Sequence, residues 1–167
     1  MLNHLLLFRM TLVNFAAAAL AIWAYQQGYI APLFEQDTSR ISYAIVALFT
    51  IGLASGHYRA WRVGEAKDEF KQQFAVSYLQ RKAKKMASKN EHIADIANWL
   101  FTLGMLGTVI GFYIALVGYG ANDTAQVTEG MRVAIGTTII GGCLALWIDV
   151  LRRMLDTATA GFLEDVV

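Results

Sequence analysis

Four long apolar stretches constrain this chain more than any other feature of its sequence. They run roughly over residues 10–31, 41–61, 93–117 and 131–151. A hydrocarbon core of about 30 Å is crossed by about 20 mostly apolar helical residues, so each stretch is long enough for one crossing. With 56% apolar and only 16% charged residues, the composition is not that of a soluble enzyme domain. We therefore expect an all-α, polytopic membrane protein with four transmembrane helices.

The distribution of basic residues predicts how these helices are oriented. Residues 57–92 carry nine of the fourteen Lys and Arg residues, whereas the hairpin at 118–129 carries none. Because positively charged loops stay on the cytoplasmic side, the segment 57–92 is predicted to be cytoplasmic. Arg152 and Arg153 follow the fourth stretch and predict the same side for the C-terminus. One topology satisfies every loop, with both termini in the cytoplasm and both hairpins outside.

The segment between the second and third spans is predicted to form a helical cytoplasmic stalk. Residues 65–88 contain no Gly or Pro and are rich in helix-favouring residues. Three aromatic residues recur there at i,i+4 and would form one stripe, and Ser88 followed by Glu91 is typical of a capping box that opens a new helix. A stalk packed on its neighbours and a docking face for a soluble partner both stay open. The docking residues would be Phe70, Phe74, Tyr78, Arg81, Lys82, Lys84 and Lys85.

The sequence offers no constellation for catalysis or metal binding. Cys143 is the single cysteine, and the three histidines lie far apart, without the spacing that metal binding on a helix requires. A net charge of +1 carries no basic excess of the kind that marks a nucleic-acid-binding protein. We therefore expect no enzymatic activity, no metal or other cofactor and no nucleic-acid partner.

Ionisable residues are confined to the ends of the predicted spans. Asp95 and Asp149 lie near the cytoplasmic ends of the third and fourth spans, and Arg132 lies near the outer end of the fourth. Their side chains can reach the membrane interface. No carboxylate lies near the middle of any span. A proton carrier in the membrane would therefore have to come from another protein.

Two threonines are predicted to lie at the same depth in the third and fourth spans. Thr108 is about ten residues from the outer end of its span and Thr138 about eight from the outer end of the next, which places both ~12 to 15 Å deep at ~1.5 Å per residue. Either hydroxyl alone could bond a carbonyl of its own helix. Together they could line a polar path or bind a partner's carboxyl group.

The same two spans are rich in glycine, and this pattern predicts that other helices approach them closely. A small residue removes the side-chain bulk that would otherwise separate two helix backbones. The predicted packing positions are Gly104, Gly107, Gly111, Gly136, Gly141 and Gly142.

At these residues the chain resembles the MotA/TolQ/ExbB family of proton-channel subunits. Residues 103–111, LGMLGTVIG, resemble the family's LGLLGTVxG helix, and residues 130–141, GMRVAIGTTIIG, resemble its G-(M/I)-x-x-A-(L/I)-x-x-T-x-x-G helix. The two strings come in family order and are joined by a short outer hairpin. The resemblance covers roughly residues 93–153. Where many TolQ and ExbB chains carry a glutamate in the last span, this chain has Val133.

The resemblance implies an ion-conducting subunit of a rotary motor in the bacterial inner membrane. A homopentamer would surround a dimeric, single-span partner that supplies a membrane aspartate, and protons or sodium ions would drive rotation. By motif position, Thr108 and Thr138 match the family threonines that line the ion path, and the neighbouring Thr137 is a further candidate. Four spans resemble the flagellar-stator branch, although the cytoplasmic loop is far shorter. The alternative is a non-conducting four-helix scaffold or assembly protein, in which these residues only pack helices.

These predictions divide the chain into four parts. They are a peripheral transmembrane helix pair (1–61), a basic cytoplasmic helical segment (62–92), a channel hairpin (93–153) and a cytoplasmic tail (154–167).

Overall fold

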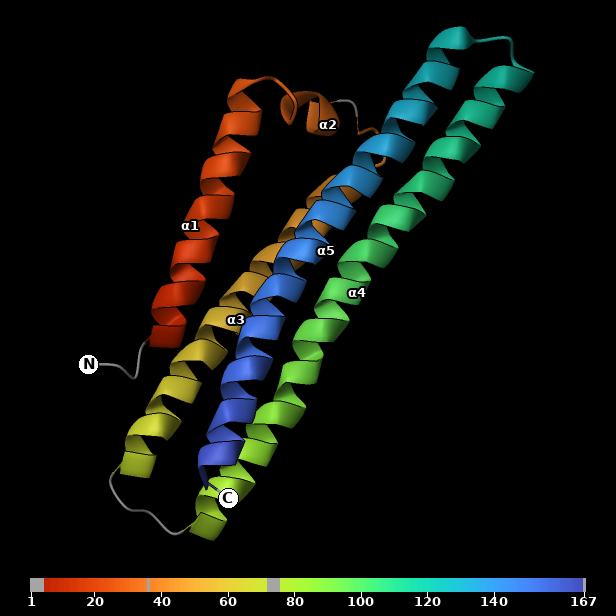
Figure 1. Ribbon diagram of the computed structural model, residues 1–167. Coiled ribbons are helices and arrows are strands. Elements are labelled where there is room, and N and C mark those ends of the chain that lie inside the picture. The colour runs from red at the N-terminus through yellow and green to blue at the C-terminus, as the bar shows by residue number, and fades with distance from the viewer. Residues whose placement is uncertain (1–4, 36, 72–75, 167) are drawn as a thin grey trace.

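The computed structural model describes residues 5–35, 37–71 and 76–166, and within these ranges the protein consists of helices joined by short turns (Figure 1). The helices are α1 (Leu5–Gln26), α2 (Ala31–Glu35), α3 (Ile41–Lys71), α4 (Val76–Gly120) and α5 (Thr124–Val166). Four of them are long and apolar enough to cross a membrane, over Leu5–Gln26, Ile41–Ala66, Lys84–Gly120 and Thr124–Gly161. The predicted all-α fold with four candidate transmembrane helices is confirmed.

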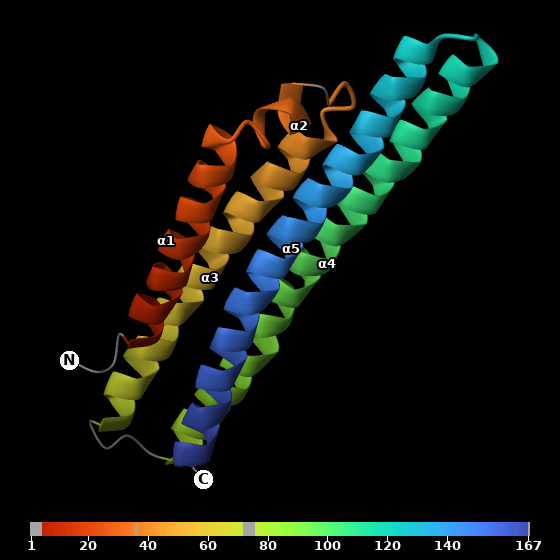
Figure 2. The same ribbon diagram turned by 45° about the horizontal axis from the view of Figure 1, so that its top comes forward.

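The long helices lie side by side and run alternately up and down (Figures 1 and 2). α4 and α5 form an antiparallel hairpin along most of their length, α3 packs against both, and α1 lies on the outside against α3 and α5. α1 begins and α5 ends at the end of the bundle where α3 ends and α4 begins. The turns after α1 and α4 lie at the opposite end, as four antiparallel crossings require.

α1 is displaced by five residues from the predicted span 10–31. The helix ends because Gly28 adopts a left-handed backbone conformation, with φ of 78°, which glycine adopts without steric cost. The N–H of Tyr29 donates to the carbonyl of Ala24 at 3.1 Å, and that of Gly28 donates to the carbonyl of Tyr25 at 3.0 Å. This is a Schellman helix end. The chain therefore turns away at a residue that the apolar run had assigned to the first span.

The predicted break before the third span is wrong. α4 passes through Ser88 and Glu91 without interruption, because residues 76–103 contain no Gly or Pro and the helix packs on α5 at this level. Asn90, which is 4% exposed, donates from Nδ2 to Asp156 and Thr159 of α5 at 3.2 and 3.3 Å. The described part of the predicted stalk thus belongs to the ends of two helices, α3 and α4.

The apolar core lies between α3, α4 and α5. Its largest fully buried side chains include Ile45 of α3, Leu100 of α4 and Ile148 of α5, whereas α1 contributes only Met10. Much of the remaining apolar surface is exposed. Phe15 of α1, for example, is 74% exposed. A continuous apolar surface of this kind is unfavourable in water, so in the membrane it is covered by lipid or by other protein.

Three polar side chains link α1 to the other helices. Trp147 Nε1 donates to Asn14 Oδ1 at 2.6 Å, Asn14 Nδ2 lies 3.2 Å from His57 Nε2, and His57 Nδ1 lies 3.0 Å from the carbonyl of Leu53. Since an amide nitrogen only donates, His57 Nε2 accepts and its ring proton sits on Nδ1. α1 is therefore held to both α5 and α3 by hydrogen bonds as well as by Met10.

Candidate functional site

The backbones of α4 and α5 approach closely enough to exclude side chains between them. A Cβ added at Gly107 would lie 2.5 Å from Thr137 Cβ, and one added at Gly111 would lie 2.4 Å from the backbone nitrogen of Ala134. Both distances are far below the ordinary contact range of 3.4–4 Å. Such close approach fixes the rotation of the two helices about their axes. The predicted glycines that lie at this interface are Gly104, Gly107, Gly111 and Gly141.

The other two predicted packing glycines lie elsewhere. A Cβ at Gly136 would lie 3.5 Å from Leu33 Cδ2 of α2, and a Cβ at Gly142 would meet no atom within 4 Å. Packing among the residues that the structure describes therefore does not account for Gly142. Sequence reasoning missed Gly118 and Gly130, where a Cβ would lie 2.8 and 2.4 Å from backbone nitrogens of the facing helix. Gly118 lies seven residues after Gly111 and Gly130 lies eleven residues before Gly141. Both spacings keep a residue on one face of a helix and could have revealed the two glycines.

The structure brings Thr108 and Thr138 together, as their matching depths predict. The two Oγ1 atoms form a hydrogen bond across the hairpin. Thr138 Oγ1 also donates to the carbonyl of Ala134 at 2.9 Å, and Thr108 Oγ1 lies 3.2 Å from the carbonyl of Gly104. Each hydroxyl has one proton, and the two protons of the pair serve the bond between the threonines and these helix carbonyls. A carboxylate that accepts a hydrogen bond from the pair would therefore replace a helix carbonyl, whereas the remaining lone pairs of the hydroxyl oxygens can accept from the water of a hydrated cation.

Thr138 is exposed and Thr108 is half-buried, so the pair is reachable from outside the chain. Thr137 is different. It is 1% exposed, donates from Oγ1 to the carbonyl of Val133 at 2.8 Å and packs against Gly107. Consecutive residues of a helix point about 100° apart, which places Thr137 inside the α4–α5 interface. Its predicted place on the ion path is therefore corrected to a packing position.

The parts of α4 and α5 around the threonine pair carry no acidic or basic side chain. Residues 96–120 and 133–148 contain no Asp, Glu, Lys, Arg or His. The nearest acidic residues along α5 are Glu129 and Asp149, nine and eleven positions from Thr138, or ~14 and ~16 Å along the helix axis. These stretches of α4 and α5 therefore bring no carboxylate of their own to the pair.

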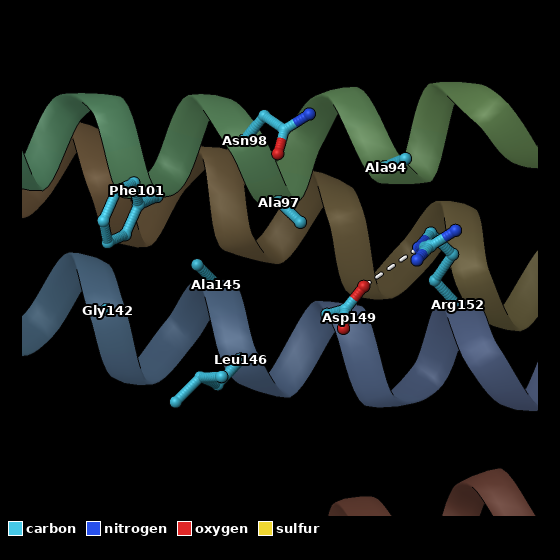
Figure 3. Close-up of a pocket in the computed structure, with 9 residues that line it drawn as sticks. All are labelled: Ala94, Ala97, Asn98, Phe101, Gly142, Ala145, Leu146, Asp149 and Arg152. Atoms are coloured by element: carbon cyan, nitrogen blue, oxygen red, sulfur yellow. Dashed lines mark hydrogen bonds and ion pairs between the residues drawn. The ribbon is translucent and has the colours of Figure 1, made fainter.

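A groove of about 460 Å³ lies between α4 and α5. Along the bundle it lies on the side of the threonine pair toward the C-terminal end of α5. Figure 3 shows its two walls, with α3 behind them. Asp149 forms hydrogen-bonded ion pairs there, with Arg152 Nε at 3.0 Å and Arg153 Nε at 2.8 Å. Sequence reasoning treated Asp149 only as an interfacial residue. The groove is lined by Ala94, Ala97, Asn98, Phe101, Gly142, Ala145, Leu146, Asp149 and Arg152.

The predicted cytoplasmic docking face is only partly within the described residues. Arg81, Lys84 and Lys85 are exposed on α4, as a docking face requires. Phe74 lies outside the described residues. Phe70 belongs to α3 and Tyr78 to α4, so these two aromatic residues do not share one helix face. Lys82 also belongs to α4.

Comparison with known proteins gives one family match. The model of the MotA/TolQ/ExbB proton channel family matches residues 40–165, which span α3, α4 and α5 and hold every residue of the site. This match is wider than the resemblance over residues 93–153 and includes α3. Searches of the curated proteins and of the solved structures found no match.

Proposed function

We propose that this chain, which belongs to the MotA/TolQ/ExbB proton channel family, is the ion-conducting subunit of an inner-membrane motor. The family is one of channel proteins rather than enzymes. The observation that carries the proposal is the outward-facing Thr108–Thr138 pair, a polar feature in a stretch of α4 and α5 that carries no Asp, Glu, Lys, Arg or His. The conducted ion is a proton or a sodium ion.

The chemistry of the pair explains why a second protein is needed. A bare charge at this depth is costly, and hydroxyl groups reduce the cost by replacing part of the hydration shell. Hydroxyls do not take up a proton at physiological pH, however, so the proton-binding acid comes from a partner. We infer that five copies of this chain surround the membrane helices of a dimeric partner, whose aspartate meets each threonine pair in turn. Ion flow then drives relative rotation of the two components.

The rest of the hairpin supports this role. The glycine contacts leave little freedom for α4 and α5 to slide or separate, which keeps the two hydroxyls at a fixed spacing. The exposed apolar faces of α4 and α5 include Val109, 66% exposed, and Leu146, 69% exposed. Neighbouring copies, the partner and lipid would cover these faces.

A scaffold without conduction is the second candidate. It is favoured by the hydrogen bonds that both threonine hydroxyls make to carbonyls of α4 or α5, since such bonds satisfy a hydroxyl without any ion. The two functions differ in one respect. A scaffold needs only the shape of these side chains, whereas a channel needs their oxygen atoms.

The test replaces the oxygen and keeps the shape. The chain is purified with its single-span partner and reconstituted into liposomes that contain a pH-sensitive dye, and proton uptake is driven by a potassium diffusion potential. Thr138→Val and Thr108→Val should each lower uptake at least about tenfold, while Thr138→Ser retains most of it. Repeating the measurement with an inward sodium gradient and a sodium-sensitive dye identifies the ion.

Thr102→Val is the matched control. Thr102 is an exposed threonine of the same helix, and its hydroxyl donates to the carbonyl of Asn98 at 2.8 Å, so the same chemical change is made away from the pair. Uptake should stay at the wild-type level. Wild-type uptake by both valine variants, with assembly intact, would refute conduction through the pair and leave the scaffold.

A further inference from the structure

The groove of about 460 Å³ between α4 and α5 shares a helix face with the threonine pair. On α4, Asn98 and Phe101 line the groove, and steps of three and four residues lead from Phe101 through 105 to Thr108. On α5, the same steps lead from Asp149 through Gly142 to Thr138. Residues three or four apart lie on one face of a helix. The groove therefore continues the surface of the pair for ~16 Å along the bundle.

The groove is polar at its far end and open at its end nearest the threonine pair. Gly142 forms part of the wall there, and a Cβ added at Gly142 would meet no atom within 4 Å, so no side chain among the described residues occupies the space beside it. Asp149 and Arg152 lie at the far end, with side chains 31% and 29% exposed (Figure 3). A groove against lipid is normally apolar throughout, because charged side chains are costly there.

The charges at this end are arranged to cancel. Each carboxylate oxygen of Asp149 accepts one hydrogen bond from a guanidinium group, from Arg152 Nε at 3.0 Å and from Arg153 Nε at 2.8 Å. Arg152 also donates from Nη1 to Asp156 at 3.0 Å. Two acidic and two basic residues thus carry no net charge, and both guanidinium groups are bonded to the helix that bears them rather than free in the groove.

We propose that this groove is a water-filled vestibule on the cytoplasmic side of the threonine pair, through which the conducted cation passes. The inference rests on the proposed function. Asp149 is a positioning residue in it, because it holds Arg152 and Arg153 against α5 and cancels their charge. Without that carboxylate, two guanidinium groups would raise the electrostatic potential of the groove and repel a cation.

Cysteine modification tests the presence of water without any measurement of conduction. The chain already holds the matched control, because Cys143 is exposed, is adjacent to Gly142 and is not among the groove-lining residues. Gly142→Cys in a Cys143→Ser background is compared with the unmodified chain, which carries Cys143. Membrane vesicles of each orientation, from cells that also make the partner, are treated with a membrane-impermeant cationic methanethiosulfonate.

The cysteine at position 142 should react at least about tenfold faster than Cys143, because a charged, water-soluble reagent does not reach a thiol that faces lipid. The reaction should be fast only when the reagent is added from the side on which α5 ends. Equal rates at the two positions, or no reaction at position 142, would overturn the vestibule, since another helix or lipid would then fill the groove.

The electrostatic role of Asp149 is tested by comparing cationic and anionic methanethiosulfonates at position 142. Asp149→Asn should shift the ratio of the two rates about fourfold or more toward the anionic reagent, and Asp149→Asn with Arg152→Gln should return it toward the starting value. An unchanged ratio in Asp149→Asn would overturn the positioning role. These rates do not depend on Thr108 or Thr138. Failure of the vestibule is therefore distinguishable from failure of conduction at the pair.

Discussion

Gly111→Ala tests whether direct contact between the backbones of α4 and α5 organises the site. The added Cβ would lie 2.4 Å from the backbone nitrogen of Ala134 and 2.5 Å from the carbonyl oxygen of Gly130. Both neighbours are backbone atoms, so no side-chain rotation can relieve the overlap. Restoring an ordinary contact of 3.4 Å requires the two helices to separate locally by about 1 Å.

The cost of this separation can be set against the gain in helix propensity. Overpacking of a close interface costs about 1–3 kcal/mol, and contact with two backbone atoms places Gly111→Ala at the upper end. Replacing a helical glycine by alanine returns about 1 kcal/mol. The net loss is about 2 kcal/mol, which lowers the melting midpoint of a chain of this size by about 4–8 °C.

The assay is thermal unfolding of the purified chain in mild detergent, followed by tryptophan fluorescence. Gly142→Ala is the matched control, because it makes the same chemical change at a helical position with no atom within 4 Å. It should melt at or above the wild-type midpoint. If Gly111→Ala and Gly142→Ala have the same melting midpoint, the two backbones are not in contact and the geometry derived for the threonine pair is refuted.

Two further predictions concern the polar contacts that hold the helix ends and α1 in place. Burial raises the pKa of Asp37, but hydrogen bonds from Ser39 and Ser42 outweigh it and hold the pKa below its ordinary value of 3.8. The folded pKa is thus depressed, and the stabilisation by Asp37 is complete above 3.8 and lost as the pH falls through the lowered pKa. Asp37→Asn makes the same hydrogen bonds neutral and should therefore lower the melting midpoint at pH 7 by the equivalent of about 1 kcal/mol. The difference from wild type should shrink in acid, and a pH-independent difference would contradict this. Asn14→Ala leaves Trp147 Nε1 without its acceptor and should lower the free energy of unfolding by about 1–3 kcal/mol. A double-mutant cycle with Trp147→Phe should show coupling between the two residues. Strict additivity of the two losses would mean that the contact does not hold α1.

The sequence was sufficient to predict the number of membrane spans and the meeting of the two threonines. Both depend on position along the helix axis, which residue counting gives directly because each residue adds ~1.5 Å. In an antiparallel hairpin, equal distances from the turn mean equal depth. Thr108 and Thr138 therefore meet in the structure, as counting predicts.

Several features that depend on rotation about the helix axis were not predicted. Thr137 and Thr138 have the same depth, yet only Thr138 is exposed, since Thr137 packs against Gly107. Because depth does not determine which way a side chain faces, the outward position of Gly142 and the groove beside Asp149 were not predicted either. Rotation is decided by which small residues meet across the interface, and this requires both helices to be considered together.

The break predicted at Ser88 and Glu91 failed for a related reason. A serine followed by a glutamate three residues later is typical of a helix start, but the same residues are also acceptable on the surface of a continuous helix. Contacts with α5 through Asn90 and the buried Ile93, 1% exposed, keep α4 continuous at this level. Tertiary packing therefore overrode a local signal.

The proposed motor requires that copies of this chain enclose a partner with the membrane acid that the middle of α4 and α5 lacks. Native mass spectrometry of the detergent-solubilised chain, alone and with a single-span partner bearing a membrane aspartate, determines whether they do. We expect five copies of this chain, and five copies with two of the partner in the mixed sample. A monomer or dimer that takes up no such partner would contradict the motor and leave a membrane protein that only packs its own helices.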